Sequence, residues 1–157
     1  MAGKVRLTPP ANIHLTLKFL GDVSQEDLAR LAEAFEPVRE RHEPFEAGIS
    51  SFGAFPSPRR ARILWAGIGQ GAEELRALAR DVEESLEPLG FEHEDRTYVP
   101  HLTLGRARGR PVALEMVESS PVPGFLVRQV ELVESVLGGA GAAYSTLAAY
   151  PFSEGRD

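Results

Sequence analysis

The order of the predicted elements indicates an α+β fold in which antiparallel strands pack against helices on one side. Two stretches, 24–40 and 72–88, carry apolar residues at helical spacing, and shorter alternating stretches surround them. Short turns join several neighbouring strands, which is typical of antiparallel pairing. With 157 residues the chain is long enough for one domain with a full core.

The N-terminal part predicts one strand and one helix. Residues 1–11 are turn-like, and 12–20 alternates and is rich in β-forming residues, which predicts a strand. Ser24 is followed three residues later by an acidic residue, which is the pattern of a helix N-cap. The helix should run to about Glu40, although Pro37 is a point at which it could end or kink.

The middle of the chain predicts two strands and the second helix. Residues 45–52 alternate like a strand, and the Gly- and Pro-containing stretch 53–58 predicts a loop. Residues 62–68 form a mostly apolar strand candidate. The helix over 72–88 then ends at a Pro-Leu-Gly sequence.

The last third predicts mainly strands. Residues 96–104 read as a strand interrupted at Pro100, and 112–118 as a short helix. The long alternating stretch 125–137 predicts a strand or a strand pair, and a glycine-rich turn leads to a final strand over 144–152.

Composition and charge exclude several classes of protein. The chain has no cysteine, which rules out a disulfide scaffold and a cysteine nucleophile. It has neither a membrane-length apolar run nor a signal peptide, so we expect a cytoplasmic protein. A net charge of −6 disfavours a broad, non-specific nucleic-acid binder. It still allows a small basic cleft that meets one phosphate or one RNA end.

A repeated tetrapeptide stands out. His14-Leu15-Thr16-Leu17 recurs 87 positions later as His101-Leu102-Thr103-Leu104, in a chain with only four histidines. On a strand, residues two apart face the same way, so each histidine shares a face with its threonine. Two such strands side by side would present two imidazoles and two hydroxyls to one ligand.

This set of side chains suits phosphoester chemistry. One histidine takes a proton from the attacking oxygen, the other gives one to the leaving oxygen, and threonine hydroxyls hold the non-bridging oxygens. No metal and no cofactor are required. A structural role for the motifs is one alternative, and a metal site is another, with a third ligand from His42, His93 or a carboxylate. We expect both of those residues to be solvated, and the residues alone do not assign which motif histidine is the acid.

The motifs and their surroundings resemble the two-histidine phosphoesterases, and most closely the RNA 2′,3′-cyclic phosphodiesterases, also known as 2′-5′ RNA ligases. The resemblance covers most of 9–152. It is carried by the following segments: 12–21, 52–56, 62–67 and 98–106.

The resemblance implies a two-lobed fold with antiparallel sheets lining a central cleft and helices packed outside. It implies hydrolysis of an RNA terminal 2′,3′-cyclic phosphate to a 2′-phosphate, with weak, reversible 2′-5′ ligation. His14 would donate the proton to the leaving 3′ oxygen and His101 would activate water. Thr16 and Thr103 would bind the phosphate, and the chain would act as a monomer without DNA or membrane.

Arg106 matches a basic, phosphate-binding position after the second motif of this family. It lies five residues after His101, so on a regular strand it would face the other way. Gly105 offers a solution, because glycine in a strand often marks a bulge that re-aims the next side chain.

Four further residues are candidates for RNA contact. Arg59 and Arg60 belong to a dense basic cluster, although such runs are more often solvated. Phe55 and Tyr98 are candidates for stacking on bases, with core packing as the alternative.

The chain departs from the family at its N-terminus, where relatives carry an additional strand and helix. If these are truly missing, we expect an unpaired sheet edge, lower stability and dimerisation or strand exchange. Two other functions stay open: a module that binds RNA ends without turnover, and a phosphodiesterase for a small cyclic nucleotide or ADP-ribose cyclic phosphate.

Overall fold

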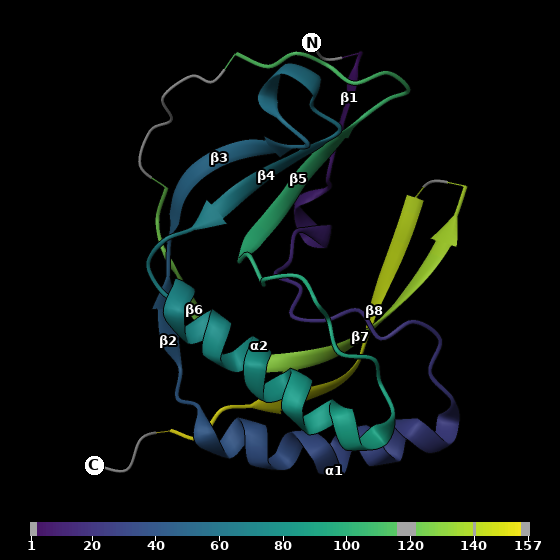
Figure 1. Cartoon of the computed structure of the whole chain (residues 1–157), viewed down its shortest axis with the longest axis vertical. Coiled ribbons are helices and arrows are strands. Elements are labelled where there is room, and N and C mark those ends of the chain that lie inside the picture. Colours follow the sequence, from purple (N-terminus) through teal and green to yellow (C-terminus); the bar gives the residue numbers. More distant parts are fainter. Residues whose placement is uncertain (1–2, 116–121, 140, 155–157) are drawn as a thin grey trace. The chain divides into compact units, whose positions relative to one another are not determined.

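A computed structural model describes residues 3–115, 122–139 and 141–154. The chain forms two compact units (Figure 1). Unit 1 comprises Met1–Thr16, Ala47–Ala72 and Val99–Phe125. Unit 2 comprises Leu17–Glu46, Glu73–Tyr98 and Leu126–Asp157. The predicted α+β class, with antiparallel sheets, is confirmed.

Unit 1 is built on a four-stranded antiparallel sheet in the order β1-β5-β4-β3. These strands span Val5–Leu7 (β1), His101–Ala107 (β5), Ile63–Ile68 (β4) and Ile49–Phe55 (β3). Two single turns of 3-10 helix, Pro10–Asn12 and Pro58–Arg60, connect elements of this unit. Alternate residues of the strands and residues of the neighbouring loops fill a small core: Val5, Ala54, Ala61, Leu64, Ala107, Val112 and Leu114.

The prediction of a strand over 12–20 is wrong, and so is the prediction that 1–11 is only turn. The first strand is β1, and it ends before two prolines that have no N–H to donate to the neighbouring β5. A 3-10 turn over Pro10–Asn12 takes up the chain there. The chain then returns to the same edge of β5 through one isolated bridge, Leu15 to Leu102.

Unit 2 contains α1, Gln25–Arg41, and nearly all of α2, Ala72–Leu86. Ser24 caps α1 by accepting a hydrogen bond from the Asp27 N–H at 3.2 Å, as predicted, and Pro37 lies inside the helix without ending it. Strands β7 and β8 form an antiparallel hairpin, and the short β2 and β6 pair with each other. Their bounds are Phe45–Ala47 (β2), Phe125–Val127 (β6), Gln129–Gly138 (β7) and Gly141–Pro151 (β8).

The core of unit 2 joins one face of each helix to the hairpin. Its fully or nearly fully buried members come from α1, α2, β8 and the residue after β8: Leu31, Phe35, Val38, Leu78, Val82, Leu86, Tyr150 and Phe152. The helical spacing that predicted both helices therefore marks the faces that are buried.

The other boundaries differ in detail. The strand predicted over 45–52 is two strands, β2 and β3, and β3 runs on through part of the predicted loop 53–58. Strand β5 begins only after Pro100. In the stretch 112–118, Val112 bridges Ala61 and 113–115 is not helical, while 116–118 lie outside the described residues. The stretch 125–137, predicted as a strand or a strand pair, forms β6 and β7, which pair with β2 and β8 respectively, and the final strand is confirmed as β8.

In the described part of the chain, no helix is long and apolar enough to cross a membrane.

Candidate functional site

The two His-x-Thr motifs lie side by side in unit 1. The bridge between Leu15 and Leu102 is antiparallel and joins the centres of the two motifs. Antiparallel pairing therefore sets His14 across from Thr103, and Thr16 across from His101. The four polar side chains share one face. The two histidines are diagonal neighbours across the pair, a relation that separates residues by about 7–8 Å. A local twofold arrangement relates the motifs, which explains why the tetrapeptide is repeated.

Both histidine rings are anchored in the same way. Nδ1 of His14 lies 2.6 Å from the backbone oxygen of Asn12, and Nδ1 of His101 lies 2.7 Å from the backbone oxygen of Val99. A carbonyl oxygen only accepts hydrogen bonds, so Nδ1 carries the proton in each bond. In each neutral ring, Nε2 is then the nitrogen that carries the lone pair.

Arg106 shares the face of His101 because the ladder between β4 and β5 is irregular. Gly67 pairs with His101 and Trp65 with Thr103. Continued without a shift, this register would pair Ile63 with Gly105, but Ile63 pairs with Arg106. One extra residue of β5, Leu104, is accommodated at this shift. The bulge predicted from Gly105 is therefore present, and the register returns Arg106 to the face of Thr103.

Aromatic rings lie next to His101 on this face. The ring centroids of Phe55 and His101 are 5.7 Å apart in an edge-to-face arrangement, and those of Phe55 and Trp65 are 5.4 Å apart. A Cβ atom at Gly53 would lie within 2.2 Å of the Trp65 ring, so the indole lies flat across the neighbouring strand. Phe55 is 39% exposed and thus offers a ring surface beside the histidine.

The remaining predicted site residues are Arg59, Arg60 and Tyr98. Arg59 and Arg60 are exposed on the 3-10 turn that follows β3 in unit 1. Tyr98 belongs to unit 2, and its buried hydroxyl has no hydrogen-bond partner among the described residues. Burial raises the pKa of Tyr98 to about 12.

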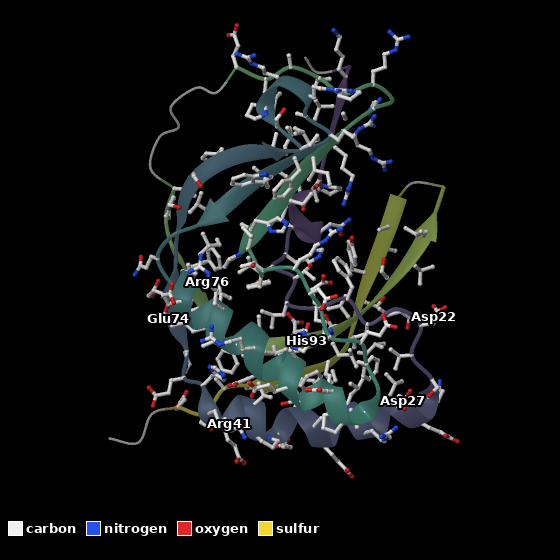
Figure 2. The ribbon with its side chains drawn as sticks, viewed as in Figure 1. Asp22, Asp27, Arg41, Glu74, Arg76 and His93 are labelled. Carbon is white, nitrogen blue, oxygen red and sulfur yellow. The ribbon has the colours of Figure 1, made fainter. Side chains whose placement is uncertain are left out.

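Charge is distributed very unequally between the units. Unit 1 holds eight of the 17 Lys and Arg residues but only two of the 23 Asp and Glu residues, a formal charge of +6. Unit 2 holds the other nine basic and 21 acidic residues, a formal charge of −12; carboxylates such as Asp22, Asp27 and Glu74 lie there (Figure 2). Both motif histidines therefore lie in a basic environment suited to an anionic ligand.

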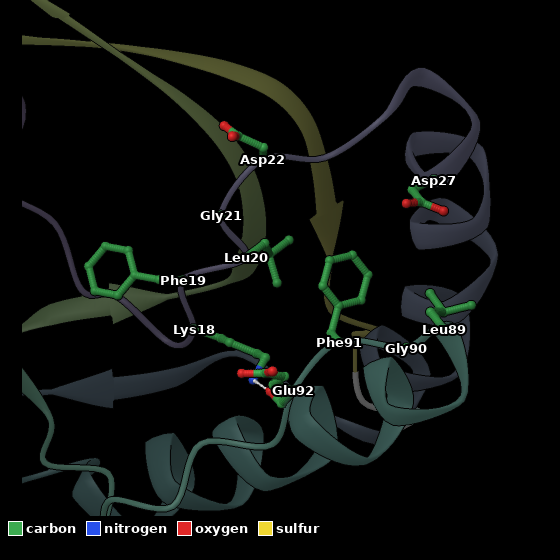
Figure 3. Close-up of a pocket in the computed structure, with 10 residues that line it drawn as sticks. All are labelled: Lys18, Phe19, Leu20, Gly21, Asp22, Asp27, Leu89, Gly90, Phe91 and Glu92. Atoms are coloured by element: carbon green, nitrogen blue, oxygen red, sulfur yellow. Dashed lines mark hydrogen bonds between the residues drawn. The ribbon is translucent and has the colours of Figure 1, made fainter.

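Unit 2 has a hollow of about 450 Å³, whose lining includes Phe19, Phe91, Asp22 and Glu92 (Figure 3). No histidine lines it. The Lys18 amino group donates hydrogen bonds at 2.7 Å to Glu83 and to the backbone oxygen of Glu92. Its carboxylates make this hollow a poor place for a phosphate.

The other two histidines, His42 and His93, belong to unit 2. His42 is not solvated as predicted: its Nε2 lies 2.6 Å from Asp81 and its side chain is only 13% exposed. His93 is exposed, as predicted, and its Nδ1 bonds the backbone oxygen of Glu94 (Figure 2). The described residues include no cluster of three or more His, Cys, Asp or Glu side chains placed to hold a metal ion.

A family model described as the 2′-5′ RNA ligase superfamily matches residues 6–139. The chain belongs to the 2′-5′ RNA ligase superfamily. Curated relatives named RNA 2′,3′-cyclic phosphodiesterase include one from Aeropyrum pernix, 36% identical over 87% of this chain and 80% of its own length. Another, from Archaeoglobus fulgidus, is 37% identical over 91% of this chain and 81% of its own length.

Solved structures with a similar fold match nearly the whole chain. A crystal structure of TT0787 from Thermus thermophilus superposes with a TM-score of 0.80 at 25% identity, over 98% of this chain and 85% of that one. A crystal structure of E. coli LigT complexed with 3′-AMP gives a TM-score of 0.75 at 26% identity, over 95% of this chain and 82% of that one.

Sequence reasoning missed one residue of this site and one cation outside it. Trp65 forms part of the face beside Thr103, and Arg6 lies directly opposite Arg106 on β1. The alternation Lys4-Val5-Arg6-Leu7 carried the signal for β1, but the prolines that follow it made the whole segment look like a turn.

Proposed function

We propose that this chain hydrolyses the 2′,3′-cyclic phosphate at the end of an RNA to a 2′-phosphate. The pairing of the two motifs across the Leu15–Leu102 bridge carries the proposal, because it presents two oriented imidazoles and two hydroxyls on one face. The names of the relatives support the same reaction.

In the proposed reaction one imidazole is a base and the other an acid. His101 Nε2 takes a proton from water as the water oxygen attacks phosphorus. The bond between phosphorus and the 3′ oxygen breaks, and His14 donates its Nε2 proton to that oxygen. The products are a free 3′ hydroxyl and a 2′-phosphate, and the two histidines end with their protonation states exchanged.

The polar groups beside the histidines stabilise the phosphate as charge develops on its oxygens. Thr16 lies across from His101 and Thr103 across from His14, so each hydroxyl is placed beside the opposite imidazole. Arg106 adds a positive charge on the same face. The histidines supply both proton transfers, so the reaction needs no metal and no cofactor.

With an RNA 5′ hydroxyl in place of water, attack on the cyclic phosphate with loss of the 3′ oxygen would join two RNA ends through a 2′-5′ linkage, in a weak, reversible ligation. Phe55 offers a ring on which a terminal base could stack beside His101. A chain without cysteine fits a reducing compartment, and we place the reaction in the cytoplasm, catalysed by a monomer.

The test is the rate of hydrolysis of an oligoribonucleotide that ends in a 2′,3′-cyclic phosphate, with EDTA present. We expect His14→Ala and His101→Ala each to lower kcat by at least roughly a hundredfold, since each removes one proton transfer. The wild-type kcat/KM should follow a bell-shaped pH profile, because one histidine must be neutral and the other protonated.

His93→Ala is the matched control, since His93 is an exposed histidine of unit 2 outside both motifs, and it should keep the wild-type rate. Equal rates for the wild type and either motif variant would refute the two-histidine mechanism. Tight binding of a 2′-phosphorylated end without turnover would instead identify a binding module.

A further inference from the structure

A second set of cations continues along the sheet from the histidine face. In the antiparallel pair of β1 and β5, Arg6 is directly opposite Arg106. The Arg108 N–H donates to the Lys4 backbone oxygen at 2.8 Å, so the pairing extends one step further and sets Lys4 opposite Arg108. Residues two apart on a strand share a face, so all four cations lie on one face of this pair.

This face is the one that carries the second motif. The register with β4 places His101, Thr103 and Arg106 opposite alternate residues of one strand. From His101 the face therefore continues through Thr103 to the pair Arg6–Arg106, and then to the pair Lys4–Arg108. We refer to these four residues as the cationic track.

Like charges directly opposite each other destabilise a pair of strands. A ligand with repeated negative charges would offset this repulsion at both pairs. Beyond them lies a hollow of about 500 Å³ whose lining includes Lys4, Arg108 and Arg110.

We propose that the cationic track binds the backbone phosphates that precede the reacting end of the RNA, so that the enzyme prefers oligonucleotides to mononucleotides. This inference rests on the proposed function. The two pairs are two residues apart on each strand, about 7 Å, which is on the scale of one nucleotide. Arg6 would meet the first internal phosphodiester from beside Arg106, whose charge serves the reacting phosphate, and Lys4–Arg108 would meet the second.

The experiment measures kcat/KM for a mononucleotide, a dinucleotide and a trinucleotide, each ending in a 2′,3′-cyclic phosphate. We expect the wild-type value to rise roughly tenfold with the first internal phosphate, as for a charge-assisted hydrogen bond, and again with the second. Arg6→Gln should abolish the first gain and leave the mononucleotide within about twofold of wild type. Lys4→Gln should remove only the gain of the trinucleotide.

Arg80→Gln is the matched control, because it removes the same charge from an exposed position of α2 in unit 2. It should leave both gains intact. The slope of log(kcat/KM) against log[salt] for the trinucleotide should become shallower by about 0.7 for each phosphate contact that a track variant removes.

Two results would overturn the track: no length dependence in the wild type, or an equal loss on all three substrates in the track variants. Turnover of the mononucleotide that His101→Ala abolishes would still uphold the proposed function in either case. If the wild type hydrolyses none of the substrates, the proposed function is refuted but the track is not. The track is then tested by the affinity for mono-, di- and trinucleotides that carry a 2′-phosphate. We expect the wild-type affinity to rise with length and the track variants to lose the same gains, and equal affinities would refute the track.

Discussion

At the scale of single residues, the histidines show what spacing predicts and what it does not. The i, i+2 spacing placed each histidine and threonine on one face, and the pairing of Leu15 with Leu102 is consistent with this. The carbonyls that orient the rings belong to Asn12 and Val99. Their positions depend on the path of the backbone before each motif, which no side-chain pattern records.

Gly53 gives a test of the rings beside His101. A Cβ atom there would meet the Trp65 ring at 2.2 Å, so the indole must move and would disturb Phe55, which contacts both rings. Gly53→Ala should cost about 1–3 kcal/mol of unfolding free energy and lower kcat. Chemical denaturation and the hydrolysis assay measure the two effects.

The control is Gly139→Ala, since a Cβ there meets nothing within 4 Å. It should leave stability and rate unchanged. If Gly53→Ala behaves like this control, Trp65 does not hold the site.

The Tyr98 hydroxyl gives a pH-dependent test. Burial raises its pKa to about 12, so the folded protein holds this proton more tightly than the unfolded chain. The associated stability is complete below about pH 10, the ordinary tyrosine value, and falls as the pH rises towards 12. Tyr98→Phe should show a shallower alkaline loss of stability in urea titrations at pH 9–11.

At neutral pH the same variant should be as stable as the wild type or slightly more stable, because the buried hydroxyl finds no partner in the described part of the chain. Clear destabilisation by Tyr98→Phe would show that the hydroxyl makes a bond in the folded protein.

At the scale of elements, the helices were predictable and the edge of the sheet was not. Helical spacing and the Ser24 cap report on local interactions, and α1 begins where they predict. Strand formation depends on partners distant in the sequence. The stretch 12–20 has the composition of a strand, yet among the described residues it pairs at Leu15 alone, because β1 occupies the adjoining part of the β5 edge.

A largely buried ion pair joins the segment that precedes α1 to α2 in unit 2. Lys18 bonds Glu83 of α2 at 2.7 Å, and their side chains are 7% and 13% exposed. Glu83→Leu leaves an uncompensated buried charge and should cost about 3 kcal/mol of unfolding free energy, whereas adding Lys18→Met should recover most of that loss. Urea denaturation of the single and double variants measures both.

The exposed pair Arg76–Glu73 is the matched control, with side chains 39% and 85% exposed. Glu73→Gln should change stability by no more than about 0.5 kcal/mol. Additive losses in the Lys18 and Glu83 variants would contradict a coupled, buried pair.

At the scale of the whole molecule, the net charge of −6 concealed the most informative electrostatic feature. Averaged over the chain, the charge disfavours contact with nucleic acid, but the fold gathers eight of the 17 basic residues into the unit with both motif histidines. Three separate stretches of sequence contribute to that unit, so no local pattern could reveal it. The repeated motif, by contrast, was visible from the sequence and led to the correct superfamily.

The most direct test of the proposed function is the identity of the product phosphate. An oligoribonucleotide that ends in a 2′,3′-cyclic phosphate is incubated with the wild type, with His14→Ala and with His101→Ala, and the products are separated by chromatography. We predict a 2′-phosphate from the wild type and uncleaved cyclic phosphate from both variants. A 3′-phosphate, or a 2′-phosphate formed equally well by either variant, would contradict the account.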